Sequence, residues 1–118
     1  MMNAERDLKP RTKEFARRVI RLFAALSKDT AAQILGKQLL RAGTSVGANY
    51  REANRARTKA EFISKIGDCL KEADESSYWM ELLLDEGFLP PAKLQPLLDE
   101  ANELVAIFVT ISKRARGD

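Results

Sequence analysis

The sequence predicts an all-α protein that folds as an antiparallel up-down-up-down four-helix bundle. Four segments repeat apolar residues at intervals of three and four, the spacing of one helix face, and no segment shows the alternation typical of a strand. The helices are expected at approximately residues 10–27, 30–56, 58–86 and 91–116. Their connections are short, which makes neighbouring helices run antiparallel. With 118 residues, the chain is expected to form a single domain, residues 1–118, around one modest core.

The first two helices are placed by their starting residues. Pro10 is favoured in the first turn of a helix, and the first helix is expected to run from there to about Ser27. Its inner face is expected to carry Phe15, Val19, Leu22, Phe23 and Leu26. Asp29 or Thr30 can cap the free backbone amides of the second helix, which is expected to reach about Ala56.

The third and fourth helices are bounded by turn residues. The third is expected from about Thr58 to Glu86, where Gly87 offers a stop. Its inner residues are expected to be Phe62, Ile66, Cys69, Leu70, Ala73, Ser77, Met80 and Leu84. The fourth follows Pro90 and Pro91. Its inner residues are expected to be Leu94, Leu97, Leu98, Ala101, Leu104, Val105, Phe108, Ile111 and Ser112.

Composition narrows the class of protein. Hydrophobic residues make up 45% and charged residues 31%, which is typical of a globular protein. There is no apolar run of about 18 residues and no secretory leader, so we expect a cytoplasmic protein without a membrane partner. Cys69 is the single cysteine, and histidine, the commonest general base and metal ligand, is absent, so neither a metal nor a cofactor is expected. The formal net charge of +3 permits a nucleic-acid partner without requiring one.

The second helix presents three different faces. Its core stripe is Leu35, Leu39, Ala42, Val46 and Ala53. Its polar stripe is Gln38, Arg41, Ser45, Asn49 and Glu52. Its third stripe is Gly36, Leu40, Gly43, Gly47 and Tyr50. Glycine inside a helix costs up to about 1 kcal/mol relative to alanine, so a glycine stripe indicates that another backbone approaches closely. The approach is either packing inside the bundle or contact with a second subunit.

An aromatic patch on the third helix favours a second subunit. Tyr78, Trp79 and Leu82 lie outside the core arc of that helix, and contiguous exposed apolar surface usually marks an interaction site. The alternative is that the loop at 87–93 covers the patch. The candidate subunit interface is therefore Leu40, Gly43, Gly47, Tyr50, Tyr78, Trp79 and Leu82.

The segment QLLRAGTSVGANYREA (38–53) resembles the second-helix pattern Q-L-x-R-A-x-x-S-I-x-x-N-I-A-E-G of the 23S rRNA-intervening-sequence proteins. The matching residues are Gln38, Leu39, Arg41, Ala42, Ser45, Val46, Asn49 and Glu52, and Glu72 matches a glutamate that recurs in the third helix. The sequence departs at Tyr50, Arg51 and Ala53, where the family tends to have I-A and then glycine, and Ala53 predicts a longer helix. Cys69 stands where a small serine is common, which favours a packing role over a reactive thiol.

The resemblance implies a four-helix bundle that assembles into a ring, with a homopentamer as the expected form and no established enzymatic activity. The family is distantly similar to the accessory variability determinant of diversity-generating retroelements, which binds nucleic acid and a partner reverse transcriptase. This relative supplies the functional analogy.

Basic residues form three clusters that are candidates for nucleic-acid contact. The clusters are Lys13, Arg17 and Arg21, with Lys28, on the first helix; Arg51, Arg55, Arg57 and Lys59 around the second turn; and Lys113, Arg114 and Arg116 at the end of the fourth helix. Repeated around a ring, they would form an extended basic surface that displaces counterions from phosphates. Alternatively, they are ordinary solvated faces balanced by acids such as Glu14, Glu61 and Asp68.

The polar residues also permit an enzymatic interpretation. Arg41, Asn49, Glu52, Glu72 and Glu75 could converge for acid–base chemistry, but an Arg41–Glu72 pair could equally fix the helix register. Gln38, Ser45 and Asn49 would then be its hydrogen-bond partners. We favour a structural or assembly role and expect no catalytic residues. The predicted function is a non-enzymatic, homo-oligomeric accessory protein that binds RNA or DNA through basic surfaces; the alternative is a scaffold or adaptor that binds a protein partner without nucleic acid.

Overall fold

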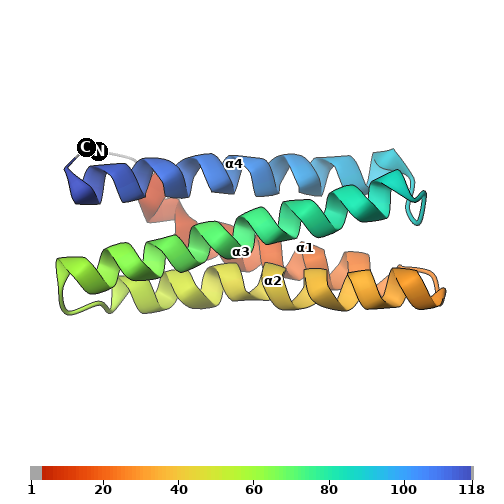
Figure 1. Cartoon of the computed structure of the whole chain (residues 1–118), viewed down its shortest axis with the longest axis horizontal. Coiled ribbons are helices and arrows are strands. Elements are labelled where there is room, and N and C mark those ends of the chain that lie inside the picture. Colours follow the sequence, from red (N-terminus) through yellow and green to blue (C-terminus); the bar gives the residue numbers. More distant parts are fainter. Residues whose placement is uncertain (1–3, 118) are drawn as a thin grey trace.

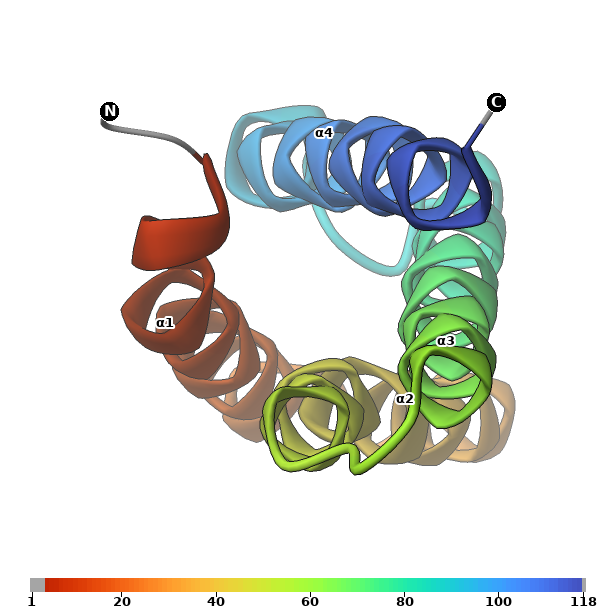
Figure 2. The same cartoon turned by 90° about the vertical axis from the view of Figure 1, so that its left-hand side faces the viewer.

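The structure, a computed structural model, describes residues 4–117, with side chains from Leu8 onward. Within this range the chain forms four α-helices and no strand: α1 (Ala4–Ala24), α2 (Thr30–Asn54), α3 (Lys59–Asp85) and α4 (Pro91–Arg116). The helices pack side by side along the long axis of a molecule of 45 × 23 × 23 Å (Figure 1). Helix α2 packs against both α1 and α3, while α1 and α4 share the smallest interface (Figure 2). None of the described helices is long and apolar enough to cross a membrane.

Helix α1 starts earlier than the sequence pattern predicts. It begins at Ala4 rather than at Pro10, which lies inside the helix, and it ends at Ala24 rather than near Ser27. The predicted start was wrong because Leu8, which is fully buried, extends the apolar face by a further turn. Packing of that turn therefore outweighs the preference of proline for the first turn of a helix.

Side-chain caps fix the starts of α2 and α3. One carboxylate oxygen of Asp29 accepts hydrogen bonds from the backbone amides of Ala31 and Ala32 at 2.9 and 3.2 Å. The hydroxyl of Thr58 accepts from the amide of Glu61 at 3.0 Å. Each cap satisfies backbone donors that a helix start leaves unpaired, as predicted for Asp29.

Glycine and proline define the other boundaries. Gly87 follows α3 with a φ of 72°, a left-handed conformation that other residues rarely adopt. Pro91 is the first residue of α4, where its missing N–H costs nothing. Gly117, with a φ of 85°, closes α4 in the same way as Gly87 closes α3.

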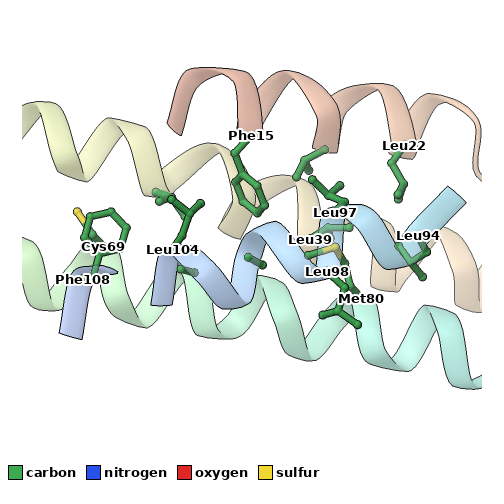
Figure 3. Close-up of a cluster of buried hydrophobic side chains, with 14 of the residues drawn as sticks. Phe15, Leu22, Leu39, Cys69, Met80, Leu94, Leu97, Leu98, Leu104 and Phe108 are labelled. Carbon is green, nitrogen blue, oxygen red and sulfur yellow. The ribbon is translucent and has the colours of Figure 1, made fainter. Parts of the chain in front are cut away.

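The core forms where the apolar stripes of the four helices meet (Figure 3). Its largest fully buried side chains include Phe15 from α1, Leu39 from α2, Met80 from α3 and Phe108 from α4. Burying a side chain of this size contributes about 1.5–3 kcal/mol. The predicted inner residues are buried except Phe23, Leu35, Phe62, Leu70, Leu84 and Val105, which are partly buried and pack against the core.

Cys69 belongs to this core. Its side chain is fully buried, and burial raises the pKa of the thiol to about 12. The neutral thiol is therefore the form present at ordinary pH, which agrees with the predicted packing role.

The glycine stripe of α2 faces α1 of the same chain. A Cβ atom on Gly43 would lie 2.8 Å from Cγ2 of Val19, and one on Gly47 would lie 3.1 Å from Oγ1 of Thr12. A Cβ atom on Gly36 would be closer still, at 2.6 Å from Leu26, which follows α1, and 2.9 Å from Phe23 near the end of α1. Of the two predicted alternatives, packing inside the bundle is therefore the one observed.

Tyr50 is also an internal residue. Its side chain is only 5% exposed, and its ring centroid lies 6.2 Å from that of Phe108 on α4. Leu40 is half-buried against the core. Assigning Gly43 and Tyr50 to a subunit interface was wrong, because both are buried within the chain and the period of the stripe cannot tell a neighbouring helix from a neighbouring subunit. Gly47 also faces α1 but is only partly buried, so its place in an interface stays a prediction.

Candidate nucleic-acid interface and assembly surface

The polar stripe of α2 faces α3 and makes ion pairs with it. Nη1 of Arg41 lies 3.3 Å from Oε2 of Glu72, and Nη2 lies 2.9 Å from Oε1 of Glu75. The hydrogen bond and charge of Glu72 raise the pKa of Arg41 above its ordinary value. The predicted Arg41–Glu72 pair is confirmed, and Glu75 is an additional partner.

A second ion pair lies further along the same two helices. Nζ of Lys65 is 2.6 Å from Oε1 of Glu52, and this contact raises the pKa of Lys65. Later positions of α2 thus pair with earlier positions of α3. The two pairs fix the register of α2 against α3 at two separate levels.

The other members of the polar stripe do not join these pairs. The hydroxyl of Ser45 donates to the backbone carbonyl of Arg41, at 2.7 Å. Within the described residues, the side chains of Gln38 and Asn49 contribute no hydrogen bond to the Arg41–Glu72 pair. The prediction that all three support this pair was wrong: Ser45 bonds to the backbone of its own helix, and the guanidinium of Arg41 is held by Glu72 and Glu75.

The same geometry separates the candidate acid–base residues. Glu52 is bound by Lys65, whereas Glu72 and Glu75 share Arg41. The side chains of Arg41 and Glu52 are 52% and 53% exposed, so water screens these charges. The arrangement is suited to holding two helices together.

Two polar atoms on α3 are buried without a hydrogen-bond partner among the described residues. They are Oε1 of Glu72 and Nε1 of Trp79. The two residues are seven apart in α3 and so lie on the same face, two turns from each other. Buried donors and acceptors are nearly always paired in folded proteins, so this face has unused hydrogen-bonding capacity.

The predicted aromatic patch lies on this part of α3. The side chain of Tyr78 is 54% exposed and meets Trp79 edge to face, with ring centroids 5.1 Å apart. Trp79 and Leu82 are half-buried. On α2, Ile34 is 58% exposed. The segment at 87–93 therefore leaves Tyr78 open to solvent.

A basic groove runs between α1 and α2. It contains a hollow of about 270 Å³ lined by Lys9, Thr12, Lys13, Ala16, Thr44, Gly47, Ala48 and Arg51. A smaller hollow of about 60 Å³ is lined by Lys9, Arg51, Asn54 and Arg55. We define the basic groove by its cations Lys9, Lys13, Arg51 and Arg55.

The groove joins two of the clusters that the sequence presents separately. Lys13 belongs to the first cluster, and Arg51 and Arg55 belong to the second. Among the described residues, no carboxylate lines either hollow. Lys9 was missed because the first helix was expected to start at Pro10; its position one turn before Lys13 was the available signal.

The remaining candidate cations lie in other settings. Arg17 and Arg21 contact the carboxylate of Glu14 at 3.7 and 3.5 Å, so they are already partly neutralised. Arg57 and Lys59 are exposed at the turn between α2 and α3. Lys113, Arg114 and Arg116 are exposed at the end of α4, where Arg116 donates to the hydroxyl of Ser112 at 2.6 Å.

Most of these cations share one end of the molecule. The turn between α2 and α3 and the C-terminal end of α4 lie together in Figure 1, at the end where α1 begins. We call this region the basic end: the basic groove together with Arg57, Lys59, Lys113, Arg114 and Arg116. Its concentration of positive charge is suited to contact with an extended anion.

Comparisons with known proteins agree on one family. The sequence profile described as 23S rRNA-intervening sequence protein matches residues 6–110. The fold is similar to the crystal structure of a protein with unknown function from the S23 ribosomal protein family of Bacteroides thetaiotaomicron, with a TM-score of 0.85 and 35% identity. That match covers 92% of this chain and 97% of the other. A comparison with curated protein sequences found no match.

Proposed function

The chain belongs to the family of 23S rRNA-intervening sequence proteins, and from this premise we propose that it is a non-enzymatic accessory protein that binds RNA or DNA through the phosphate backbone. The observation that carries the proposal is the basic groove, where four cations from α1, α2 and the C-cap of α2 surround two hollows lined by no described carboxylate. Cations that neutralise phosphates release condensed counterions, which favours binding whatever the base sequence.

The rest of the basic end extends this contact. Arg57 and Lys59 add exposed cations at the turn between α2 and α3, and Lys113, Arg114 and Arg116 add exposed cations in the last turn of α4. Among the described residues that line the groove, none is an aromatic residue on which bases could stack. The proposed recognition therefore uses phosphates rather than bases.

We further propose that the antiparallel up-down-up-down bundle assembles into a homo-oligomeric ring, with the pentamer implied by the family resemblance. Support comes from the aromatic patch on α3, where Tyr78 is exposed and Nε1 of Trp79 has no hydrogen-bond partner among the described residues. A ring would repeat the basic end in each subunit, which raises the number of phosphates in contact with one assembly.

The second candidate function is a scaffold or adaptor that binds a protein partner without nucleic acid. The observation that favours it is the same aromatic patch, because Tyr78 and Trp79 are residue types enriched at protein interfaces. In this case the cations of the basic end would be ordinary solvated side chains.

A fluorescence titration separates the two functions. Labelled RNA and DNA oligomers of unrelated sequence are titrated with the protein at about 50 mM and about 200 mM salt. The nucleic-acid proposal expects binding to both oligomers at low salt and much weaker binding at high salt. Absence of binding at low salt would contradict it and leave the adaptor function.

A further inference from the structure

The interface between α1 and α4 contains an apolar pocket with a basic rim. The pocket has a volume of about 290 Å³ and lies towards the C-terminal end of α1. Its apolar lining is Leu22, Ala25, Leu89 and Leu97, and its rim carries Arg18, Arg21 and Lys93. An engineered protein cavity of about 150 Å³ accommodates benzene, so this pocket has room for one aromatic side chain.

The chain carries a surface of complementary chemistry on α3. Tyr78 is the exposed aromatic residue of that helix, and Asp74, Glu81 and Asp85 lie four before, three after and seven after it. These spacings place the three carboxylates on the same side of α3 as Tyr78. Among the described residues, none of the three is in an ion pair.

Other charges on this side of α3 leave it acidic. Lys71, seven residues before Tyr78, is the cation of the same stripe. Glu75 is also nearby, but its carboxylate is bound by Arg41. The surface around Tyr78 therefore offers one aromatic ring and an excess of carboxylates. The pocket offers an apolar lining and three cations, of which Arg21 also contacts Glu14 and Arg18 and Lys93 are in no ion pair among the described residues.

We infer that Tyr78 of one copy inserts into the α1–α4 pocket of a second copy, with Asp74, Glu81 and Asp85 facing Arg18, Arg21 and Lys93. This contact rests on the self-association proposed above and assigns the two surfaces that meet. Both the apolar match and the charge match come from the same chain, which makes a second copy the occupant of the pocket.

The two surfaces lie on different sides of the bundle. Figure 2 shows α3 across the molecule from α1, which forms one wall of the pocket. Each subunit therefore uses its pocket for one neighbour and its Tyr78 for the other. Such a head-to-tail contact produces a closed ring when the rotation between neighbours closes, and a filament when it does not.

Blocking each surface separately tests the contact. Tyr78→Ser removes the inserted ring, and the double variant Arg18→Glu/Lys93→Glu reverses the charge of the pocket rim. Multi-angle light scattering at micromolar concentration is expected to give an oligomer for the unaltered chain and monomers for both variants. The control is Ile20→Ser. It removes an exposed apolar side chain of α1 that does not line the pocket, and this variant is expected to keep the oligomer.

Mixing the two blocked variants provides a sharper readout. The Tyr78→Ser chain keeps an intact pocket, and the rim variant keeps an intact Tyr78 surface, so one contact between them remains. The mixture is expected to form a dimer containing one chain of each kind and nothing larger. Thermal unfolding by circular dichroism verifies that each variant is folded before it is mixed.

The possible results distinguish this contact from self-association in general. If the unaltered chain is monomeric, both the assigned contact and the proposed self-association are overturned. An oligomer that survives both blocking changes would leave self-association standing and overturn the assigned contact. If only the rim variant dissociates, another segment fills the pocket and the role of Tyr78 is wrong.

Discussion

Arg11 of α1 binds Glu100 of α4 through two parallel hydrogen bonds. Nε donates to Oε2 at 2.7 Å and Nη2 donates to Oε1 at 2.8 Å, while a third contact reaches Glu103 at 3.0 Å. These contacts raise the pKa of Arg11 above its ordinary value. Helices α1 and α4 share the smallest helix interface. The Arg11–Glu100 pair is therefore a main polar contact that holds the first helix against the last.

Arg11→Ala is expected to lower the free energy of unfolding by about 1–2 kcal/mol, a range that allows for partial screening by water. Glu100 would be left without its partner, and its side chain is only 16% exposed. Urea denaturation followed by circular dichroism measures the change. Arg17→Ala, which removes an exposed pair with Glu14, is the control and should change stability by less than about 0.5 kcal/mol. Equal effects of the two changes would contradict a special role for Arg11.

Gly43→Ala is expected to destabilise the protein by about 1–2 kcal/mol. The new Cβ would lie 2.8 Å from Val19, whose branched side chain has little freedom to move, and this overlap outweighs the better helix propensity of alanine. Gly67→Ala is the matched control in α3, because a Cβ there meets nothing within 4 Å. The control should stabilise the protein by about 0.5–1 kcal/mol. Thermal unfolding measures both changes. If the two variants shift the melting temperature in the same direction, the packing argument is contradicted.

Glu72→Ala is expected to cost about 1 kcal/mol of stability, because Arg41 loses one of its two carboxylate partners. A double-mutant cycle with Arg41→Ala isolates the pair from other effects of each change. The two single changes should sum to more than the double change. Strict additivity in urea denaturation would mean that the Arg41–Glu72 contact does not stabilise the fold.

Cys69 is expected to be unreactive in the folded protein. Burial keeps the thiol neutral, so Ellman's reagent should label it slowly near pH 8 and rapidly after addition of urea. The raised pKa also has a consequence for stability. The pKa of the thiol is 9.0 in the unfolded chain and about 12 in the folded protein. The contribution of the neutral thiol to stability is therefore complete below pH 9 and is lost as the pH rises towards 12.

The pH effect is measured against a Cys69→Ala variant. Other groups also titrate at alkaline pH, so the relevant quantity is the difference in free energy of unfolding between the two chains. That difference should change between about pH 9 and pH 12, with the original chain losing more stability. Parallel curves over this range would show that the thiol is not shielded from water.

Lys13→Ala/Arg51→Ala is expected to weaken nucleic-acid binding and to reduce its salt dependence. Each phosphate contact on duplex DNA contributes about −0.9 to the slope of log K against log salt, so losing two contacts should make the slope shallower by about two. The control is Lys28→Ala/Lys37→Ala, which removes two exposed cations away from the groove. An equal change in slope for both pairs would assign binding to net charge instead of to the groove.

The fold could be predicted largely from the sequence, because the apolar period and the capping residues act locally. Asp29 and Gly87 mark helix ends through chemistry within a few residues of themselves. The early start of α1 could not be predicted, since it depends on Leu8 being buried by other helices. Tyr50 shows the same limit: its partner Phe108 is far away in the sequence.

The candidate sites could be predicted only in part. The Arg41–Glu72 pair was accessible because both residues belong to a familiar pattern on adjacent helices. The basic groove was not, because Lys13 and Arg51 come together only when α1 packs against α2. That packing depends on the contact between Gly47 and Thr12, which the sequence alone cannot assign to one chain or two.

The basic end makes the two ends of the bundle different in charge, so the long axis of the molecule has a defined polarity. Copies related by a single rotation axis along the bundle keep the same direction, so every basic end would emerge on the same rim of a ring. Such a ring has two unlike faces. A nucleic acid that binds the basic ends would meet the ring from one side only, and the opposite face would stay free.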